Sequence, residues 1–396
     1  MKRSVRMLAL VTSVTLMGGI AACSSAAAEP SASASGPIKI GVALPLSGPL
    51  APASVPYKTV IENIGKGIPN TDTIDGRKVE IVLRDSQGTA AGSSATIRQL
   101  LDQDSVDVVI GPLYTAEAEA AMPLTTQSKK LEVTLSGCPT CGDAEKYPTV
   151  FSVEADRPSQ MPPTVKWMKD SGLQKVAVLV SNDGAGKGYA DAFTSEAQKG
   201  GVNVVKTVSF APNSLDLGSQ VAQLKASGAD AVYLASAVPV DNATATKAMR
   251  QADYQPAVFG NAALAESVVT DGMDPAWLKK WASSGSGENA AAPKAPQQSL
   301  ALRDALNKIA GSKEMTRPLN QYSSAMDAFG MIKAAIEGTH TTDAAQLTAW
   351  LVKNGFKGTK ADFTFTAGQH NGMTPDAQVL VQPGTMNNGF LTRVGK

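Results

Sequence analysis

Apolar runs alternate with amphipathic segments along most of the chain. Strand-like runs, either nearly all apolar or alternating, lie at 38–44, 78–83, 106–110, 175–180, 202–208 and 230–234. Runs that are apolar throughout are typical of parallel strands covered on both faces. Segments with apolar residues at helical spacing lie at 57–64, 96–103, 189–199 and 217–224. Strands that alternate with helices in this way indicate βαβ units and therefore an α/β fold.

The pattern consists of two successive sets of strands and helices, which predicts two lobes. The segment 283–298 is rich in Ser, Gly, Ala and Pro, and we expect a loop or crossover there. Helices are then predicted at 300–309, 322–337 and 343–354, and short strands around Phe363 and at 379–381. Because the chain returns to strands so late, we expect several crossings between the lobes.

The first 22 residues have the three parts of a secretory signal. A basic start is followed by an uncharged, mostly apolar stretch at 7–20, which is shorter than the roughly 20 residues of a spanning helix. Ile20-Ala21-Ala22-Cys23 follows and resembles the bacterial lipobox, in which the Cys thiol is acylated. The alternative is an ordinary cleaved signal with a chance cysteine. We expect a lipoprotein signal peptide at 1–22 and lipidation of Cys23.

The segment 23–36 is predicted to be a flexible tether. After Cys23 it consists almost entirely of Ser, Ala, Pro and Gly, a composition that cannot form a core. The body from about Pro37 onward is long enough for two domains. We therefore expect an extracytoplasmic protein, periplasmic or on the outer face of the cell membrane, that contacts the membrane through its lipid anchor alone.

The charge and the cysteine content indicate which classes of partner the chain can bind. The chain has 36 basic and 35 acidic residues, and removal of the signal takes away three basic ones, so no basic field points to a nucleic acid. If Cys23 carries lipid, Cys138 and Cys141 remain as a pair that is expected to oxidise outside the cytoplasm. A redox role needs an exposed thiol at a helix start. A metal site lacks partners, because His340 and His370 are the only histidines and are expected in exposed loops.

Motifs for catalysis are missing. The Gly-rich stretch 184–188 fails as a nucleotide loop, because Ser181 stands where Gly is needed and Gly188 where Ser or Thr is needed. It fails as a dinucleotide loop because Tyr189 stands at the third Gly. The chain also has no Gly-x-Ser-x-Gly elbow and no zinc-protease motif. We therefore expect a protein that is not an enzyme, without a cofactor or a metal.

Six stretches, in this order, resemble the type I periplasmic binding proteins, in particular the leucine-binding branch of ABC-transporter receptors. They are 38–50, 75–80, 104–112, 146–148, 188–193 and 228–234. The resemblance implies an α/β fold with two doubly wound parallel-sheet lobes joined by a three-segment hinge. It places lobe 1 at 37–152 and 286–362, and lobe 2 at 153–285 and 363–396.

The resemblance also implies a function. A small-molecule ligand would lie in the cleft at the carboxyl ends of the parallel strands. Closure of the lobes by a monomer would signal loading to an ABC permease in the membrane. The alternative is a sensor of the same fold that delivers its ligand to a membrane receptor.

Two lobe 1 loops are the expected site for a ligand carboxylate. The first is Leu113-Tyr114-Thr115, where a helix start would offer backbone N–H groups and a favourable dipole, although Thr115 also suits a helix cap. The second is Ser136-Gly137-Cys138, which departs from the family's Ser-Ala-Thr pattern. We expect a disulfide between Cys138 and Cys141 that makes this loop a rigid wall of the pocket.

The ammonium side of the site departs from the family as well. Ala185 stands where the family has an aromatic residue, and Asn261 follows a strand where the leucine-binding branch has Glu, with no carboxylate until Glu266. A buried ammonium without a partner is very costly. Two ligand hypotheses stay open: a branched-chain amino acid held by backbone donors, or a carboxylate or neutral compound without an ammonium, such as an aromatic acid.

Three further residues are candidates for the cleft: Ser47, Tyr57 and Ala237. Ser47 follows the first strand, and its alternative role is to stabilise the turn before Gly48. Tyr57 is equally suited to the core.

Overall fold

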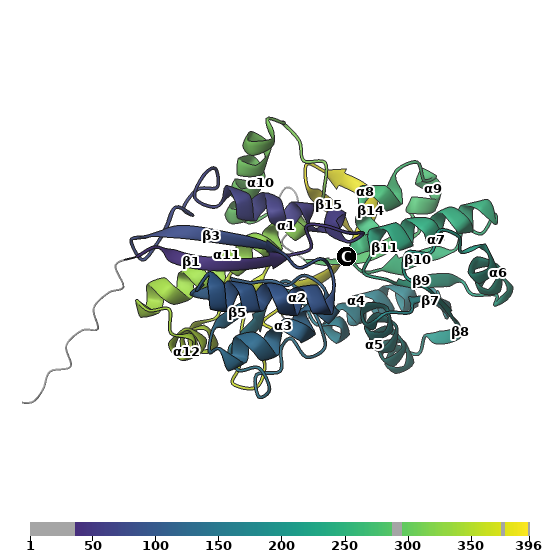
Figure 1. Ribbon diagram of the computed structural model, residues 1–396. Coiled ribbons are helices and arrows are strands. Elements are labelled where there is room, and N and C mark those ends of the chain that lie inside the picture. The colour runs from purple at the N-terminus through teal and green to yellow at the C-terminus, as the bar shows by residue number, and fades with distance from the viewer. Residues whose placement is uncertain (1–35, 287–294, 374–376, 395–396) are drawn as a thin grey trace, which may run out of the picture. The chain divides into compact units, whose positions relative to one another are not determined.

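The computed structural model describes residues 36–286, 295–373 and 377–394, and these form two α/β lobes (Figure 1). The predicted signal peptide, the lipidation of Cys23 and the tether up to residue 35 lie outside the described residues. The predicted α/β class with two lobes of mostly parallel sheet is confirmed.

The first lobe contains a sheet of six described strands in the order β2-β3-β1-β4-β5-β6. Their bounds are β1 Ile38–Leu44, β2 Thr73–Ile74, β3 Arg77–Asp85, β4 Val108–Ile110, β5 Leu131–Thr134 and β6 Val150–Ser152. All neighbours pair in parallel except the short β2, which is antiparallel to β3. After β1 the chain adds β3 on one side of β1 and β4 on the other, and such switch points are where open α/β sheets bind ligands.

The second lobe contains a sheet of seven described strands in the order β15-β14-β11-β10-β9-β7-β8. Their bounds are β7 Lys175–Ser181, β8 Asn203–Phe210, β9 Ala231–Ala235, β10 Ala257–Gly260, β11 Trp281–Ser286, β14 Gln378–Asn387 and β15 Phe390–Val394. The five strands β7 to β11 pair in parallel, and β14 and β15 add an antiparallel edge. A separate hairpin consists of β12 Phe356–Lys357 and β13 Asp362–Phe363.

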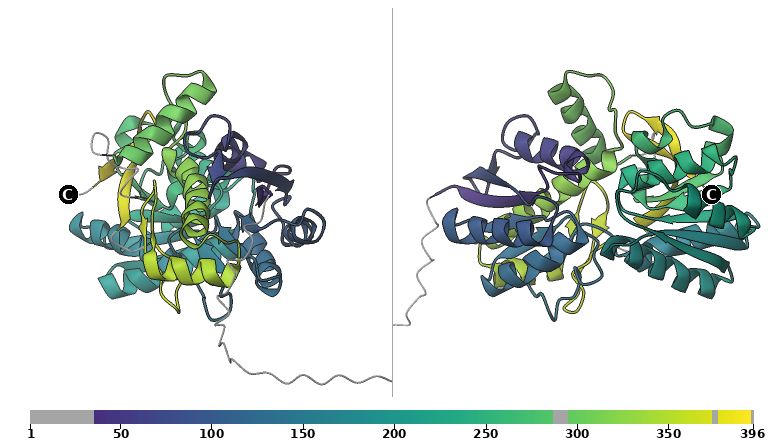
Figure 2. Two further views of the ribbon diagram at one scale, coloured as in Figure 1. Left: turned by 90° about the vertical axis from the view of Figure 1, so that its left-hand side faces the viewer. Right: turned by 45° about the vertical axis from the view of Figure 1, so that its right-hand side comes forward.

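Helices cover both sheets. Those of the first lobe are α1 Ala51–Asn63, α2 Ala90–Arg98 with a π-helical extension Gln99–Gln103, α3 Thr115–Gln127, α10 Gln297–Ala310, α11 Leu319–Thr339 and α12 Ala344–Asn354. Those of the second lobe are α4 Arg157–Asp170, α5 Gly184–Gly200, α6 Gly218–Ala226, α7 Pro239–Gln251, a 3₁₀ turn Ala262–Ala265, α8 Ser267–Thr270 and α9 Pro275–Leu278. Figure 2 shows the light-green helices α11 and α12 in the same lobe as the purple and blue N-terminal elements.

Strand β7 shows why its residues form a central strand. Val176, Val178 and Val180 pack into one hydrophobic cluster, whereas Ala177 and Leu179 pack into a second cluster on the opposite face. Successive side chains of a strand point to opposite faces, so a strand covered on both faces needs apolar residues at every position. This requirement explains the uninterrupted apolar runs in the sequence.

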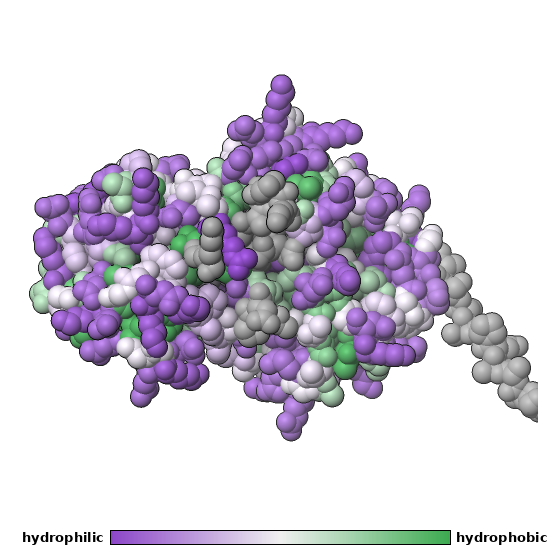
Figure 3. Space-filling model, turned by 180° about the vertical axis from the view of Figure 1, so that it is seen from behind, coloured by the Kyte–Doolittle hydropathy of each residue, from purple (hydrophilic) through white to green (hydrophobic). Residues whose placement is uncertain are grey.

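On the molecular face drawn in Figure 3, by contrast, polar side chains predominate and apolar ones form small, separated groups.

The chain passes between the lobes at three places, in agreement with the predicted three-segment hinge. It crosses at 153–156 between β6 and α4, again between β11 and α10, and a third time between β13 and β14. The lobe boundaries themselves stay a prediction. The hydrophobic core of the first lobe includes Phe363, Phe365 and Phe390. Of these, Phe390 lies on β15, a strand that pairs in the sheet of the second lobe.

The predicted loop at 283–298 is wrong at both ends. Strand β11 continues to Ser286, and α10 begins at Gln297. The strand was missed because its last residues are small and polar, although Ser283 and Ser284 are both buried. The helix predicted at 57–64 likewise begins earlier, at Ala51, because Pro52 is compatible with a first helical turn.

His370 does not lie in an exposed loop, as the sequence suggested. Its side chain is buried and stacks on Phe151 with ring centroids 4.1 Å apart, and its Nδ1 lies 3.1 Å from the carbonyl oxygen of Val150. Burial lowers the pKa of His370. The residue is therefore part of the first-lobe packing. His340 is exposed, as predicted, at the end of α11.

The buried carboxyl group of Glu132 makes the stability of the protein depend on pH. It lies on β5 with no exposed surface; Thr125 Oγ1 donates to its Oε2 at 2.6 Å, and its Oε1 has no partner. Burial raises the pKa of Glu132 to about 8. Because the pKa is raised in the folded state, folding favours the protonated form of Glu132. The contribution of this group to the free energy of unfolding is complete below the unfolded-state pKa of about 4.3, and it is lost as the pH rises through about 8.

We expect the free energy of unfolding to fall by a few kcal/mol between pH 5 and pH 9, and Glu132→Gln to reduce this slope. Denaturant titrations at the two pH values measure it. Glu80→Gln, on the exposed side of β3, is the matched control and should leave the slope unchanged. Equal slopes for wild type and Glu132→Gln would contradict the assignment.

Candidate functional site

A cavity of about 150 Å³ lies between the two lobes. Its walls include the loops that follow β4, β5, β7, β9 and β10, so the carboxyl ends of parallel strands from both sheets face it. Further lining residues come from the first crossing segment and from α1, α4, β11 and α11. The cavity is therefore located where the resemblance predicted a cleft.

Most of the predicted site residues line this cavity: Tyr57, Leu113, Tyr114, Thr115, Ser136, Gly137, Ala185, Ala237 and Asn261. Two predicted residues are not among its lining residues. Ser47 is exposed to solvent, and Cys138 is buried in a small cluster with Met122 and Tyr147. The ligand-binding role of each residue stays a prediction at this point.

The first predicted loop leads into α3. Thr115 is the first helical residue and not the cap, which is Tyr114; the backbone N–H of Tyr114 donates to Glu117 Oε2 at 3.2 Å. Ser86 Oγ donates to Glu117 Oε1 at 2.5 Å, and burial raises the pKa of Glu117 to about 7. The Thr115 hydroxyl is thus not engaged in capping, and it accepts a hydrogen bond from Arg157 Nη2 at 2.6 Å.

The second predicted loop follows β5 and lies against the first crossing segment. A Cβ atom on Gly137 would lie 2.5 Å from the carbonyl oxygen of Ala155, so only glycine allows this close approach. The loop is tied to the first one, because the N–H of Leu135 donates to the carbonyl of Pro112 at 3.0 Å. The Cα atoms of Cys138 and Cys141 lie 5.1 Å apart, within the range that a disulfide spans.

Arg157 is the main residue that sequence reasoning missed. It is the first residue of α4, is only 5% exposed, and its guanidinium lies 5.0 Å from the ring centre of Tyr189. Its Nε and Nη1 have no hydrogen-bond partner. Gly188 makes room for it, since a Cβ there would lie 3.0 Å from Nη1. A cation in the first turn of a helix is unfavourable because it opposes the helix dipole. This unfavourable position is the one feature of the sequence that could have marked Arg157 as a functional residue.

Glu154 and Lys360 form an ion pair at the edge of the cavity. Lys360 Nζ lies 2.6 Å from Glu154 Oε2 and donates to Ser324 Oγ at 2.9 Å, while Ser324 Oγ donates to Glu154 Oε1 at 2.6 Å. The Lys360 side chain is 3% exposed and that of Glu154 22% exposed. Glu154 is the only carboxylate among the lining residues that the structure describes, and both of its oxygens are therefore engaged within the protein.

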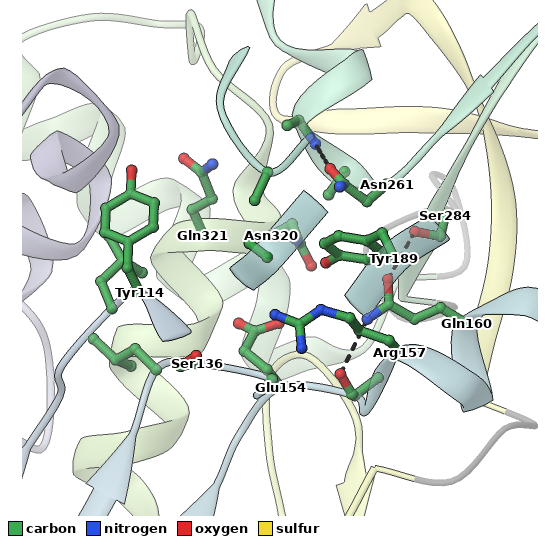
Figure 4. A pocket seen from close by; sticks show the side chains of 18 of the residues that line it. Tyr114, Ser136, Glu154, Arg157, Gln160, Tyr189, Asn261, Ser284, Asn320 and Gln321 are labelled. Atoms are coloured by element: carbon green, nitrogen blue, oxygen red, sulfur yellow. Dashed lines mark hydrogen bonds between the residues drawn. The ribbon is translucent and has the colours of Figure 1, made fainter. Parts of the chain in front are cut away.

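The amide side chains of Gln160 and Asn261 line the second-lobe wall (Figure 4). Asn261 caps the 3₁₀ turn by accepting from the N–H of Ala263 at 2.9 Å, and its Nδ2 donates to the carbonyl of Ser236 at 2.9 Å. Gln160 accepts from Ser284 Oγ at 3.2 Å. These two amides shape the wall through bonds within the protein. The Oε1 of Gln321, on α11, is buried without a partner.

Within residues 36–286, 295–373 and 377–394, no group of three or more His, Cys, Asp or Glu is arranged to hold a metal ion. Over the same ranges, no helix has both the length and the apolar character that crossing a bilayer requires.

Comparison with known proteins agrees with the fold. A family described as periplasmic binding protein matches residues 37–384. Leu/Ile/Val-binding protein homolog 3 of Brucella melitensis is 26% identical over 356 residues, which is 88% of this chain and 89% of that protein. These relatives are binding proteins.

Two solved structures share the two-lobed architecture. A solute-binding protein of an ABC transporter from Rhodopseudomonas palustris, in complex with 4-hydroxybenzoate, has 21% identity and a TM-score of 0.75, covering 91% of this chain and 96% of that one. A leucine-binding protein from Thermotoga maritima MSB8 has 17% identity and a TM-score of 0.75, covering 90% and 98%. With its own family match over most of its length, this chain belongs to the periplasmic binding protein family, with the type I fold.

Proposed function

We propose that the protein is the extracytoplasmic substrate-binding component of an ABC importer, and that it captures a small carboxylate solute between its lobes. The observation that carries this proposal is the cavity, whose lining comes from both lobes. The Arg157–Thr115 hydrogen bond joins the start of α4 to the start of α3 across that cavity. A ligand placed there contacts both lobes at once, which is what closure about a hinge requires.

The chemistry of the lining favours a carboxylate over an amino acid. The family resemblance places the ligand carboxylate at the α3 start, which lines the cavity together with a cationic side chain. Glu154, which could balance an ammonium, is already paired with Lys360. Of the two solved relatives, one binds 4-hydroxybenzoate and the other is named for leucine, so the fold accepts either class.

A thermal-shift screen of a chain comprising residues 36–396 tests the proposal. Leucine, isoleucine and valine form one set of compounds, and aromatic and aliphatic acids the other. A ligand at about 100 times its Kd stabilises the folded state by about 2.7 kcal/mol, which raises the melting temperature by a few degrees. We expect at least one acid to do so. If no compound of either set shifts the melting temperature, the proposed function is wrong for these solutes.

The membrane tether is part of the same proposal. A lipid on Cys23 would hold the binding domain close to its permease, at the end of the tether 23–36. Mass spectrometry of the mature N-terminus measures it: we expect an acylated Cys23 as the first residue. An unmodified Cys23, or cleavage elsewhere, would contradict the anchor without affecting the binding proposal.

The cysteine pair gives a prediction about the compartment. Both side chains are 1% exposed, and we expect them to be oxidised in the exported protein. Cys138→Ser/Cys141→Ser should lower the free energy of unfolding by about 2 kcal/mol, the value for a short closed loop. Alkylation of the denatured, unreduced protein followed by mass spectrometry measures the pairing. Two alkylated thiols at these positions would show that the bridge is absent.

A further inference from the structure

We infer that Arg157 is the partner of the ligand's acid group, and that the ligand is therefore a monoanion without an ammonium group. This inference rests on the proposed function and specifies the chemical class of its solute. The acid site combines one element from each lobe: the start of α3 with the Thr115 hydroxyl, and the guanidinium at the start of α4.

Arg157 is buried without hydrogen-bond partners for all of its donors. A guanidinium cannot be deprotonated in a protein and has five N–H donors. In this structure it is 5% exposed, and its Nε and Nη1 have no partner. A buried cation with unmade hydrogen bonds is unfavourable, and the dipole of α4 adds to the cost. The Tyr189 ring compensates for only part of it. An anion in the cavity would satisfy the free donors.

Helix α3, which has 13 residues, begins at the wall of the cavity. The N–H groups of its first turn have no partner within the helix and carry the positive end of its dipole. Because Arg157 Nη2 donates to Thr115 Oγ1 at 2.6 Å, the guanidinium and this helix start border the same point of the cavity. Figure 4 shows Arg157 between the Tyr189 side and the Ser136 side of the pocket. A carboxylate at this point binds donors of both lobes.

The charges of the described lining residues do not balance one another. Among the described residues that line the cavity, three are charged: the cations Arg157 and Lys360 and the anion Glu154. This described lining carries one net positive charge. A monoanion neutralises it, whereas a zwitterionic amino acid leaves it unbalanced. Releasing Glu154 to meet an ammonium would leave Lys360, 3% exposed, without its partner.

The other lining residues indicate the chemical character of the part of the solute that lies away from its carboxylate. Tyr57, Tyr114 and Tyr189 supply ring surfaces, and Gln321 Oε1, which has no partner within the protein, is available as an acceptor for a donor of the solute. The lining therefore suits a largely apolar acid, with room for one hydroxyl or amide donor away from the carboxylate.

Matched ligand pairs test the inference directly. 4-Methylpentanoate and leucine share one skeleton and differ by the α-ammonium, as do 3-phenylpropionate and phenylalanine. Isothermal titration of residues 36–396 with all four compounds, and with 4-hydroxybenzoate, measures the preference. We expect each acid to bind at least 10-fold more tightly than its amino acid. Amino acids that bind as tightly as their acids would overturn the inference and leave the proposed function standing.

Variants assign the effect to the guanidinium. Arg157→Met keeps most of the volume and removes the charge, and we expect it to weaken binding of the acids by roughly 10- to 100-fold, the range for a charged hydrogen bond. Arg157→Lys should retain part of the affinity. Arg98→Met, exposed on α2, is the control and should bind as wild type does.

The melting temperature and the acid affinity of Arg157→Met together distinguish a loss of binding from a loss of folding. The melting temperature of unliganded Arg157→Met should equal or exceed that of wild type, because the variant removes an unpaired buried cation. Undiminished acid binding by a folded Arg157→Met overturns the inference. Wild type that binds none of the compounds contradicts the proposed function, and this inference with it.

Discussion

Lys360→Met is expected to lower the free energy of unfolding by on the order of 3 kcal/mol. The substitution removes the cation that pairs with Glu154 at 2.6 Å, and leaves that carboxylate largely buried with Ser324 as its remaining side-chain partner. Removing one partner of a buried pair is costly because the other charge stays behind uncompensated. Denaturant unfolding followed by circular dichroism measures the change.

A double variant separates the ion pair from mere packing. Glu154→Gln/Lys360→Met removes both charges, so most of the stability lost in Lys360→Met should return. Lys166→Met is the control, because the pair of Lys166 with Asp170 on α4 is exposed, and it should cost less than about 1 kcal/mol. A Lys360→Met chain as stable as wild type would show that the pair does not hold this edge of the cavity.

Asp327→Ala is the second variant with a large expected effect, again on the order of 3 kcal/mol of lost stability. Asp327 is 1% exposed and accepts three hydrogen bonds, from the N–H and Oγ1 of Thr359 and from the N–H of Lys360 at 2.8 Å. Burial raises the pKa of Asp327 to about 7. Alanine leaves the N–H groups of Thr359 and Lys360 without their acceptor, and the Thr359 hydroxyl keeps only the carbonyl of Ser323 at 3.4 Å. It also frees the turn that presents Lys360 to Glu154.

Asp362→Ala is the matched control, since Asp362 is exposed on the neighbouring hairpin and should change stability by less than about 0.5 kcal/mol. Thermal and denaturant unfolding of both variants provide the comparison. Similar losses in the two variants would mean that the buried network at Asp327 is not the cause.

Much of the fold could be predicted from the sequence because its central strands are covered on both faces. Strands β7 and β9 lie as predicted, since apolar residues at successive positions leave no other arrangement. Strand β11 was missed for the opposite reason: it ends in small polar residues that face the cavity, such as Ser284. The buried state of His370 was missed because its packing partner, Phe151, is far away in the sequence.

The site could be predicted only in part. Loops that follow a strand, such as Leu113 to Thr115, were found because the ends of parallel strands meet at one edge. The charged groups were not found. Glu154 meets Ser324 and Lys360 over 170 and 206 residues of sequence, and no local pattern records such a contact. Arg157 likewise meets Thr115 only because two lobes face each other.

The central claim is that an acid lies between the lobes with its carboxylate on Arg157. A crystal structure of residues 36–396 with the tightest-binding acid of the titration tests it most directly. We expect carboxylate oxygens within hydrogen-bond distance of both the Arg157 guanidinium and the start of α3. A ligand outside this cavity, or one whose carboxylate points away from Arg157, would contradict it.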